Sequence, residues 1–194
     1  MISLPNITLV TISGIGHKQD ENVEALTKSC EGITFGEVKY IQLGQITNID
    51  SWNRAVIYEL PKYIETPHCL LIHGDGYVIH PELWNPQWLN YDYIGAPWPF
   101  PQDLYSYRDE DGNIVRVGNS VSLRSKKLME LIATRPMEYH YGNNNEDGQI
   151  CCWNRKWLES QGCTFAPLHV AKYFSKEHEI PENKNLTTFA FHSL

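Results

Sequence analysis

Three short apolar runs, separated by two stretches with helical spacing, place the strongest constraint on the fold of this chain. The runs are rich in β-branched residues and leucine, as buried strands are, and cover residues 7–12 (ITLVTI), 38–43 (VKYIQL) and 68–72 (HCLLI). Helices are expected between them at 20–31, with Asp20 as N-cap, and at 52–63, opened by Ser51. This alternation predicts a parallel sheet covered by helices, because parallel strands need a crossover connection.

The carboxyl-terminal edge of that sheet is where we expect a ligand. In open α/β sheets, ligands bind beyond the carboxyl ends of the strands. Gly14 interrupts the first run and residues 73–76 (HGDG) end the third, so both breaks lie at this edge. The Asp75 carboxylate is placed there to hold a divalent cation, and the glycines allow a bulky anion to approach the backbone. The alternative is an ordinary polar turn, in which Gly and Asp are common.

The second half of the chain predicts shorter elements. Strands are expected at 93–96 and 117–123, and helices at 81–90, 125–133 and 146–160. The proline-rich segment 97–101 (PWPFP) predicts extended chain. The length of 194 residues fits one domain, so we expect a single domain over residues 1–194.

Net charge and cysteine content narrow the range of functions. The formal charge of −7 argues against a protein that mainly binds nucleic acid, because such binding depends on clustered Lys and Arg. The five cysteines are odd in number and form no CxxC pair, which indicates reduced thiols. No segment resembles a signal peptide or a membrane-spanning stretch of about 20 apolar residues. We therefore expect a cytoplasmic protein without a membrane span, of undetermined oligomeric state.

Two polar segments carry residues suited to sugar chemistry. Glu146 and Asp147 follow a run of Asn, where one acid would act as a general base, or both would simply stabilise a helix start. Gly118, Asn119 and Ser120 beside an apolar strand indicate a sugar pocket or, equally, an ordinary loop that enters the strand.

The C-terminal tail and the middle of the chain add an imidazole and an aromatic cluster. The apolar residues 188–191 (TFAF) should anchor the tail and fix His192 in space, whereas a lone His near a terminus commonly has no special role. Six aromatic residues are close in sequence: Tyr91, Tyr93, Trp98, Phe100, Tyr105 and Tyr107. Their faces suit stacking on sugars or bases, and core packing explains about half of them equally well.

The order of these segments resembles a family of glycosyltransferase-like proteins that has not been characterised. The resemblance runs from about Ile7 to His192 and rests on the acidic turn at Asp75 followed by residues 91–98 (YDYIGAPW), 117–125 (VGNSVSLRS), 145–147 (NED) with Cys151 after it, 165–167 (FAP) and 189–192 (FAFH). More widely the chain resembles GT-A glycosyltransferases. That resemblance implies an α/β fold, a Rossmann-like three-layer α/β/α domain with a mostly parallel central sheet.

The GT-A resemblance implies a role for several of these residues. Asp75 and His192 correspond to metal ligands. Asp147 corresponds to the catalytic base, with Glu146 as the alternative base. His73 stands where the usual DxD motif has its first acid, which leaves the role of His73 open.

The same resemblance suggests where a donor would bind. Residues 118–122 correspond to the glycine-rich loop of the fold, although Gly118 is their only glycine. The candidate donor contacts are Gly118, Asn119 and Ser120 in this loop, Thr11 and Ser13 at the end of the first strand, and His73 and Gly74 in the acidic turn. Arg54 would contact the base or a phosphate, or form a surface salt bridge.

The implied reaction moves a hexosyl or pentosyl group from a nucleotide-sugar donor, such as a UDP-sugar, to an acceptor hydroxyl. A divalent cation would bridge Asp75, His192 and the diphosphate, and Mn²⁺ suits an imidazole ligand better than Mg²⁺ does. Asp147 would deprotonate the acceptor and give inversion. The acceptor class stays open between a glycan, a protein and a modified nucleobase. The alternatives are a non-catalytic carbohydrate-binding protein of the same fold and a nucleotide-diphosphate hydrolase with the same metal site.

Overall fold

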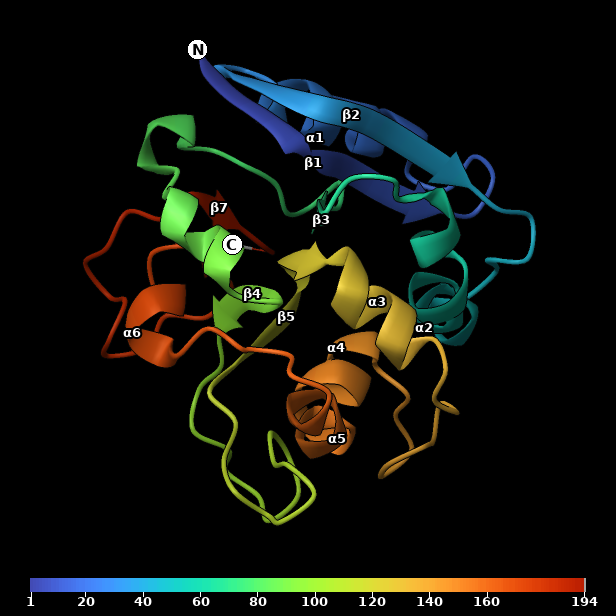
Figure 1. Ribbon diagram of the computed structural model, residues 1–194, viewed down its shortest axis with the longest axis vertical. Coiled ribbons are helices and arrows are strands. Elements are labelled where there is room, and N and C mark those ends of the chain that lie inside the picture. The colour runs from blue at the N-terminus through green and yellow to red at the C-terminus, as the bar shows by residue number, and fades with distance from the viewer. Residues whose placement is uncertain (194) are drawn as a thin grey trace.

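A five-stranded sheet in the order β2-β1-β3-β5-β4 forms the centre of the computed structural model, which describes residues 1–193 (Figure 1). Its strands are β1 (Ile2–Ser13), β2 (Ile33–Gln42), β3 (His68–Leu71), β4 (Tyr93–Pro97) and β5 (Val117–Ser125). β1 is parallel to β2 and β3, and β5 is antiparallel to β3 and β4, so β5 alone runs against the others. The mostly parallel sheet expected from the sequence is confirmed.

Helices follow the strands along the chain, and a small second sheet holds the C-terminal tail. The helices are α1 (Gln19–Ser29), α2 (Ile49–Tyr58), α3 (Lys126–Ile132), α4 (Glu146–Gly148), α5 (Arg155–Ser160) and α6 (Leu168–Ala171). Short 3₁₀ helices cover Leu60–Tyr63, Pro81–Leu83 and Pro86–Asn90, and one π-helical turn covers Gln149–Trp153. β6 (Ser175–Lys176) pairs in parallel with β7 (Ala190–Phe191) and so brings the tail back to the body of the molecule.

Alternate residues of the central strands pack in opposite directions, and this gives the fold three layers. Leu9 of β1 belongs to a core cluster with Leu26 of α1. Its neighbour Val10 belongs to a different cluster, with Val56 of α2 and Met129 of α3. Successive side chains of a strand point to opposite faces, so the apolar run of β1 is buried on both.

Three predicted helices differ in detail from those observed. Asp20 lies inside the first turn of α1, which is preceded by Lys18 in a left-handed conformation with φ 47°. Asn48, rather than Ser51, caps α2, and Ser51 completes a capping box from inside the helix. The helix expected at 146–160 is interrupted, because the backbone N–H of Asn154 bonds to the carbonyl of Gln149 five residues earlier.

The helix expected at 81–90 is also divided, into two 3₁₀ segments that both begin with a proline. Pro86 has no backbone N–H, and it disfavours a helical conformation at Asn85, which is extended with φ −119° and ψ 116°. The side chain of Asn85 instead caps the second segment by accepting from the N–H of Gln87 at 3.0 Å.

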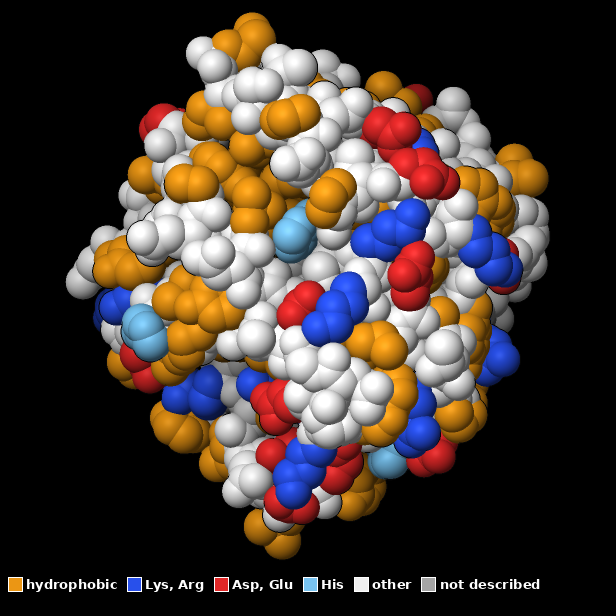
Figure 2. Space-filling model, viewed as in Figure 1, with side chains coloured by type: hydrophobic (Ala, Val, Ile, Leu, Met, Phe, Trp, Pro, Cys, Tyr) orange, Lys and Arg blue, Asp and Glu red, His pale blue; other side chains and the backbone are white. Residues whose placement is uncertain are grey.

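Charged side chains of both signs are interspersed on the face shown in Figure 2, which carries no extended basic surface. This agrees with the net charge of −7 in disfavouring nucleic acid as a partner of that face. Among the residues described, no helix has both the length and the apolar character to cross a bilayer.

Gly118 at the start of β5 is fixed by packing. A Cβ built on Gly118 would overlap the indole ring of Trp98, which is 5% exposed and stacked on Tyr107. We expect Gly118→Ala to lower the free energy of unfolding by about 1–3 kcal/mol, because the ring must shift out of a close-packed site. The matched control is Gly44→Ala, whose Cβ would meet Ile15 at an ordinary 3.6 Å. Urea unfolding of both variants tests this, and equal stabilities would contradict it.

Candidate functional site

A cleft of about 470 Å³ lies at the carboxyl ends of β1 and β3. It is bounded by the loop after β1, the start of α2, the turn after β3, the beginning of β5 and the C-terminal tail. The sequence-predicted residues that line it are Ser13, His73, Gly74, Asp75, Ser120 and His192. The ligand edge inferred from the strand pattern therefore coincides with a real cleft.

Backbone hydrogen bonds place Asp75 and His192 on the same wall of this cleft. A tight turn follows β3, in which His73 and Gly76 exchange N–H···O bonds of 2.8 and 3.1 Å. The N–H of Ser193 donates to the carbonyl of Asp75 at 2.8 Å, which ties the tail to the turn. A Cβ on Gly76 would lie 2.9 Å from Cα of His192, so glycine is needed for this approach. Oδ1 of Asp75 and Nε2 of His192 are 3.7 Å apart.

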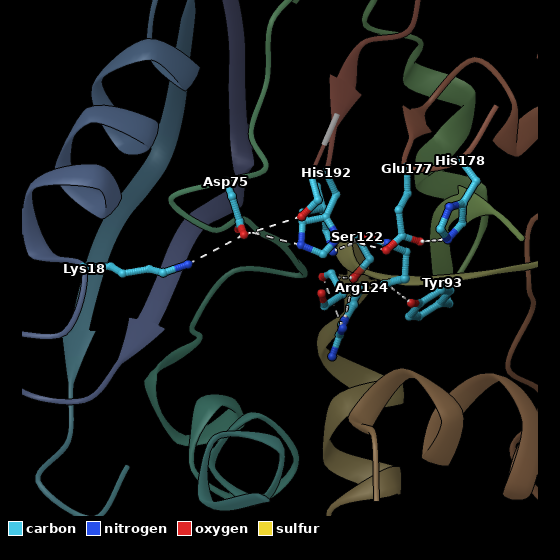
Figure 3. A network of polar contacts seen from close by, with 12 residues as sticks. Lys18, Asp75, Tyr93, Ser122, Arg124, Glu177, His178 and His192 are labelled. Carbon is cyan, nitrogen blue, oxygen red and sulfur yellow. Dashed lines mark hydrogen bonds and ion pairs between the residues drawn. The ribbon is translucent and has the colours of Figure 1, made fainter. Parts of the chain in front are cut away.

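An alternating chain of charges passes through these two side chains (Figure 3). Nζ of Lys18 is 3.7 Å from Oδ2 of Asp75, and Nδ1 of His192 is 3.4 Å from Oε1 of Glu177. Nε2 of His178 is 3.4 Å from the other oxygen of Glu177. Each ring nitrogen of His192 therefore faces a carboxylate, Nδ1 that of Glu177 and Nε2 that of Asp75.

These neighbours set the charges of Asp75 and His192. Burial raises the pKa of Asp75, but His192 and Lys18 outweigh burial, so that this pKa lies below its usual 3.8. Burial lowers the pKa of His192, but Glu177 and Asp75 outweigh it and the pKa is raised overall. Asp75 is therefore ionised at neutral pH.

His73 is a neutral imidazole without a hydrogen-bond partner. Burial, together with the nearby His192, lowers the pKa of His73 to about 3. Its Nε2 is buried and neither accepts nor donates a hydrogen bond within residues 1–193. The ring lies 5.2 Å from the Trp52 indole and 5.3 Å from the His192 imidazole, between centroids. The Nε2 of His73 is therefore open to a hydrogen-bonding partner, water or ligand, beside the cleft.

The donor set at this wall fits a divalent cation that binds together with a substrate. Asp75 contributes an oxygen and His192 a nitrogen, the ligand types that Mn²⁺ accepts. In the part of the chain that the structure describes, no group of three or more His, Cys, Asp or Glu is arranged to hold a metal. With two protein ligands, a cation at this wall would depend on water and phosphate oxygens for its other positions.

The other predicted residues of β1 and β5, which are Thr11, Gly118 and Asn119, lie behind the residues that line the cleft. Thr11 is buried and its hydroxyl donates to Oδ1 of Asn22 at 3.4 Å. Asn119 is 2% exposed and has φ 81°, and its Nδ2 lies 3.0 Å from Nδ1 of His192. Asn119 therefore orients the imidazole. Gly118 accommodates Trp98 and does not reach the cleft.

Arg54, another predicted donor contact, also lies outside the cleft. It lies on the exposed side of α2, with its guanidinium 5.6 Å from the ring centre of Tyr58. The residues of α2 that do face the cleft are Ile49 and Trp52, whose indole N–H donates to the carbonyl of Ile12 at 2.8 Å. Helical geometry explains the difference, because Arg54 is two residues beyond Trp52 and so points to another side of the helix.

Glu146 is buried and paired, so no acceptor reaches it. Its Oε2 lies 2.7 Å from Nη2 of Arg124, and both side chains are 1% exposed. Arg124 also donates from Nε to Oγ of Ser122 at 2.7 Å and lies over the Tyr93 ring. Burial raises the pKa of Glu146 to about 7, although the Arg124 guanidinium opposes the shift.

Asp147, the next residue, faces a second pocket of about 290 Å³. Its Oδ1 accepts from the N–H of Gly148 at 2.8 Å. Burial raises the pKa of Asp147 above its usual value, although the Gly148 N–H and Arg124 act in the opposite direction. Glu177 also lines this second pocket, and its contact with His192 places the pocket and the cleft on either side of one side-chain pair.

Three residues of the site gave no signal in the sequence. Glu177 lies in a polar stretch without periodicity, and only the pairing of β6 with β7 brings it to His192. Trp52 has the spacing of a buried helix residue. Lys18 follows a glycine-rich break, and only the folded structure brings its ammonium to Asp75.

Two solved structures with a similar fold are described as glycosyltransferases. One is a glycosyltransferase involved in the glycosylation of the major capsid of PBCV-1, with a TM-score of 0.59 and 11% identity over 96% of this chain and 91% of that chain. Another is the galactosyltransferase LgtC in complex with donor and acceptor sugar analogs, with a TM-score of 0.53 and 13% identity over 95% and 86%. At such identities the similarity shows the GT-A-like fold alone.

Sequence comparison gives a family without an activity. No curated protein sequence matches the chain significantly. A family match covers residues 37–192, from the middle of β2 to His192 in the tail. This range includes Asp75 of the cleft and Asp147 of the second pocket. The chain therefore belongs to the family described as "Protein of unknown function (DUF5672)".

Proposed function

We propose that this protein is a glycosyltransferase that moves a sugar from a nucleotide-sugar donor to an acceptor hydroxyl. The observation that carries the proposal is a pair of neighbouring pockets whose walls contact each other through His192 and Glu177. The cleft is lined by Asp75 and His192, the proposed metal ligands, and the second pocket is lined by Asp147. The GT-A-like fold supports this assignment, and the neighbour LgtC was solved with donor and acceptor sugar analogs.

The cleft at the end of β1 is the proposed donor site. Ser13 and Asn48 offer hydrogen-bonding groups there, and Trp52 and Ile12 offer apolar surface to a nucleoside. Lys18 extends its ammonium toward Asp75 at the same edge, where a diphosphate would add negative charge. A UDP-sugar is the donor we propose.

Asp75 and His192 would hold the divalent cation, Mn²⁺ in preference to Mg²⁺ because of the imidazole ligand. When bound, the cation supplies Lewis-acid stabilisation of the diphosphate leaving group. Glu177 and Asn119 hold the imidazole of His192 from behind, so its Nε2 stays directed at the cleft.

Asp147 is the proposed general base for the acceptor hydroxyl. Its raised pKa makes the carboxylate a stronger proton acceptor than an exposed aspartate, and it faces the pocket from which an acceptor would approach. Attack from that side, opposite the leaving group, gives inversion at the anomeric carbon.

Nucleotide-sugar binding and turnover together test the proposal. The purified chain is screened by thermal shift against a panel of nucleotide sugars with Mn²⁺, and a donor should raise the melting temperature because it binds the folded state. Transfer and donor hydrolysis are then measured with Mn²⁺ and with EDTA. The absence of any nucleotide response would refute the proposal, and equal turnover in EDTA would refute the cation. Donor consumption that ignores every acceptor would identify a hydrolase instead.

Asp75→Asn should weaken Mn²⁺ binding by at least about tenfold. Loss of a residue that only hydrogen-bonds to a metal ligand lowers metal affinity by about 10–100-fold. Asp75 is proposed as a direct ligand, so its loss should cost at least as much. The matched control is Asp20→Asn, an exposed acid in the first turn of α1 that does not line the cleft. Calorimetric Mn²⁺ titration in the presence of UDP compares the two variants, and equal affinities would exclude Asp75 as a ligand.

A further inference from the structure

The second pocket, defined by the lining residues Trp98, Tyr105, Tyr107, Tyr141, Asp147 and Trp153 with their neighbours, is built from stacked aromatic pairs. Tyr105 and Tyr141 stack with centroids 4.5 Å apart, and Trp98 and Tyr107 with centroids 4.7 Å apart. His140 and Trp153 form a third pair at 4.3 Å. Each pair joins residues from separate segments, so the rings are held in place before any ligand arrives.

The tip of one loop presents Tyr141 to this pocket at a conformational cost. His140 and Asn143 exchange backbone hydrogen bonds of 2.8 and 3.0 Å around a turn in which Tyr141 has φ 52° and Gly142 has φ 81°. Tyr141 is 72% exposed, so neither burial nor core packing accounts for a bulky side chain in the left-handed region there.

The non-glycine residues with a left-handed backbone in the described chain lie at or beside the same two pockets. Non-glycine residues with positive φ in residues 1–193 are Lys18, Tyr107, Asn119, Tyr141 and Ser193. Lys18 lines the cleft, two tyrosines line the second pocket, and the remaining two contact His192 or Asp75. Such backbone strain persists where the surrounding structure enforces it and concentrates at ligand sites.

The charge of the second pocket restricts what it can bind. Asp147 and Glu177 are its acids, and neither Lys nor Arg belongs to its lining within the described chain. The imidazoles of His140 and His178 are already close to Glu138 and Glu177, at 3.6 and 3.4 Å. A phosphate or carboxylate ligand would meet two carboxylates with no cation to balance it.

We infer that the second pocket binds an uncharged saccharide, with the apolar face of one sugar ring on Tyr141 and a hydroxyl directed at Asp147. Aromatic faces pack against the C–H face of a sugar, while Asn143 and Asn145 offer amide groups to its other hydroxyls. The volume of about 290 Å³ is near the lower limit for small-molecule pockets and admits roughly one or two rings. A folded protein surface would not enter it.

The inference deepens the proposed function, because it takes the saccharide to be the acceptor that Asp147 activates. Among the acceptor classes considered from the sequence, it selects a neutral glycan over a protein or a modified nucleobase. The binding step itself requires neither donor nor cation, so it can be measured separately from transfer.

Binding of the full chain to a glycan array, without nucleotide or metal, tests the inference. The array carries neutral mono- to tetrasaccharides beside sialylated, uronate and phosphorylated ones. Neutral glycans should bind, and anionic glycans should bind at least about tenfold more weakly. The inference is overturned if no neutral glycan binds, or if anionic glycans bind as well.

Tyr141→Asn tests the stacking role with the turn preserved, since asparagine tolerates the left-handed conformation. The variant should keep its melting temperature and bind the best neutral glycan about tenfold more weakly, measured by saturation-transfer NMR titration. The control is Tyr139→Asn, another exposed tyrosine nearby, whose hydroxyl bonds to Asp50 at 2.9 Å and which does not line the pocket. Unchanged affinity in Tyr141→Asn, or an equal loss in the control, would overturn the placement.

Binding and transfer can fail independently. If neutral glycans bind through Tyr141 but no nucleotide sugar is consumed, the saccharide site stands and the transferase proposal falls. If nucleotide sugars are turned over on a peptide or nucleobase acceptor only, the transferase proposal stands and the saccharide inference falls.

Discussion

Asp147→Asn is expected to lower kcat for sugar transfer by about 10³-fold and to leave the donor Kd within about twofold. A positioned general base contributes about 10²–10⁴-fold, and asparagine keeps the shape of the side chain but cannot accept the proton. Donor affinity should survive, because Asp147 lines the second pocket and does not line the cleft that holds the nucleotide in our proposal. Initial rates at saturating donor and acceptor give kcat, and thermal shift gives the donor Kd.

A neighbouring carboxylate provides the control for that experiment. Glu138→Gln removes an exposed acid whose carboxylate lies 3.6 Å from His140 and that does not itself line the pocket. Its kcat should stay within about threefold of the unmodified protein, because an exposed side chain outside the pocket lining does not contact the proposed acceptor. If Asp147→Asn retains more than a tenth of its activity, or loses no more than Glu138→Gln, another group is the base.

The alternation of strands and helices in the first 75 residues predicted the fold because it depends on local periodicity. Runs such as 68–72 are too apolar to be anything but buried, and one crossover per strand leaves few topologies. A single i→i−5 hydrogen bond leaves the periodicity of apolar residues unchanged. The sequence therefore predicts one helix over 146–160 and does not show its interruption at Asn154. The reversal of β5 was equally hidden, since strand direction depends on connections rather than on the strand itself.

The candidate site was predictable only where it lies at the end of a strand or an anchored tail. Asp75 directly follows β3, and apolar residues before His192 fixed its position, so the sequence indicated both. Glu177 reaches His192 through a long-range pairing that no local pattern records. Small polar residues such as Asn119 are ambiguous, because the same composition suits a ligand pocket and a tightly packed strand entry.

The buried pair of Arg124 and Glu146 contributes to the stability of the folded protein, and Glu146 is adjacent in sequence to Asp147. Arg124→Met is expected to lower the free energy of unfolding by about 3–5 kcal/mol at pH 8, because it leaves a carboxyl group that is 1% exposed without its partner. For a chain of this size that corresponds to a fall in melting temperature of about 10 °C. Thermal and urea unfolding measure both quantities.

The pH dependence of that loss identifies the buried carboxyl group as its cause. In the unfolded chain Glu146 titrates near 4.5, and in the folded protein at about 7. Without the guanidinium its folded pKa rises further, so above pH 7 the variant must keep a proton that the native protein releases. The difference in stability should therefore widen from pH 6 to pH 8.

The double variant Arg124→Met with Glu146→Leu removes both charges and provides the control. It should recover most of the lost stability, because a buried ion pair replaced by apolar side chains of similar volume is commonly neutral or better. Its own free energy of unfolding should also lack the fall that a buried Glu146 causes as the pH rises from 6 to 8, since the titrating group is gone. A loss below about 1 kcal/mol in Arg124→Met, or a loss equal at both pH values, would mean that Glu146 has another partner.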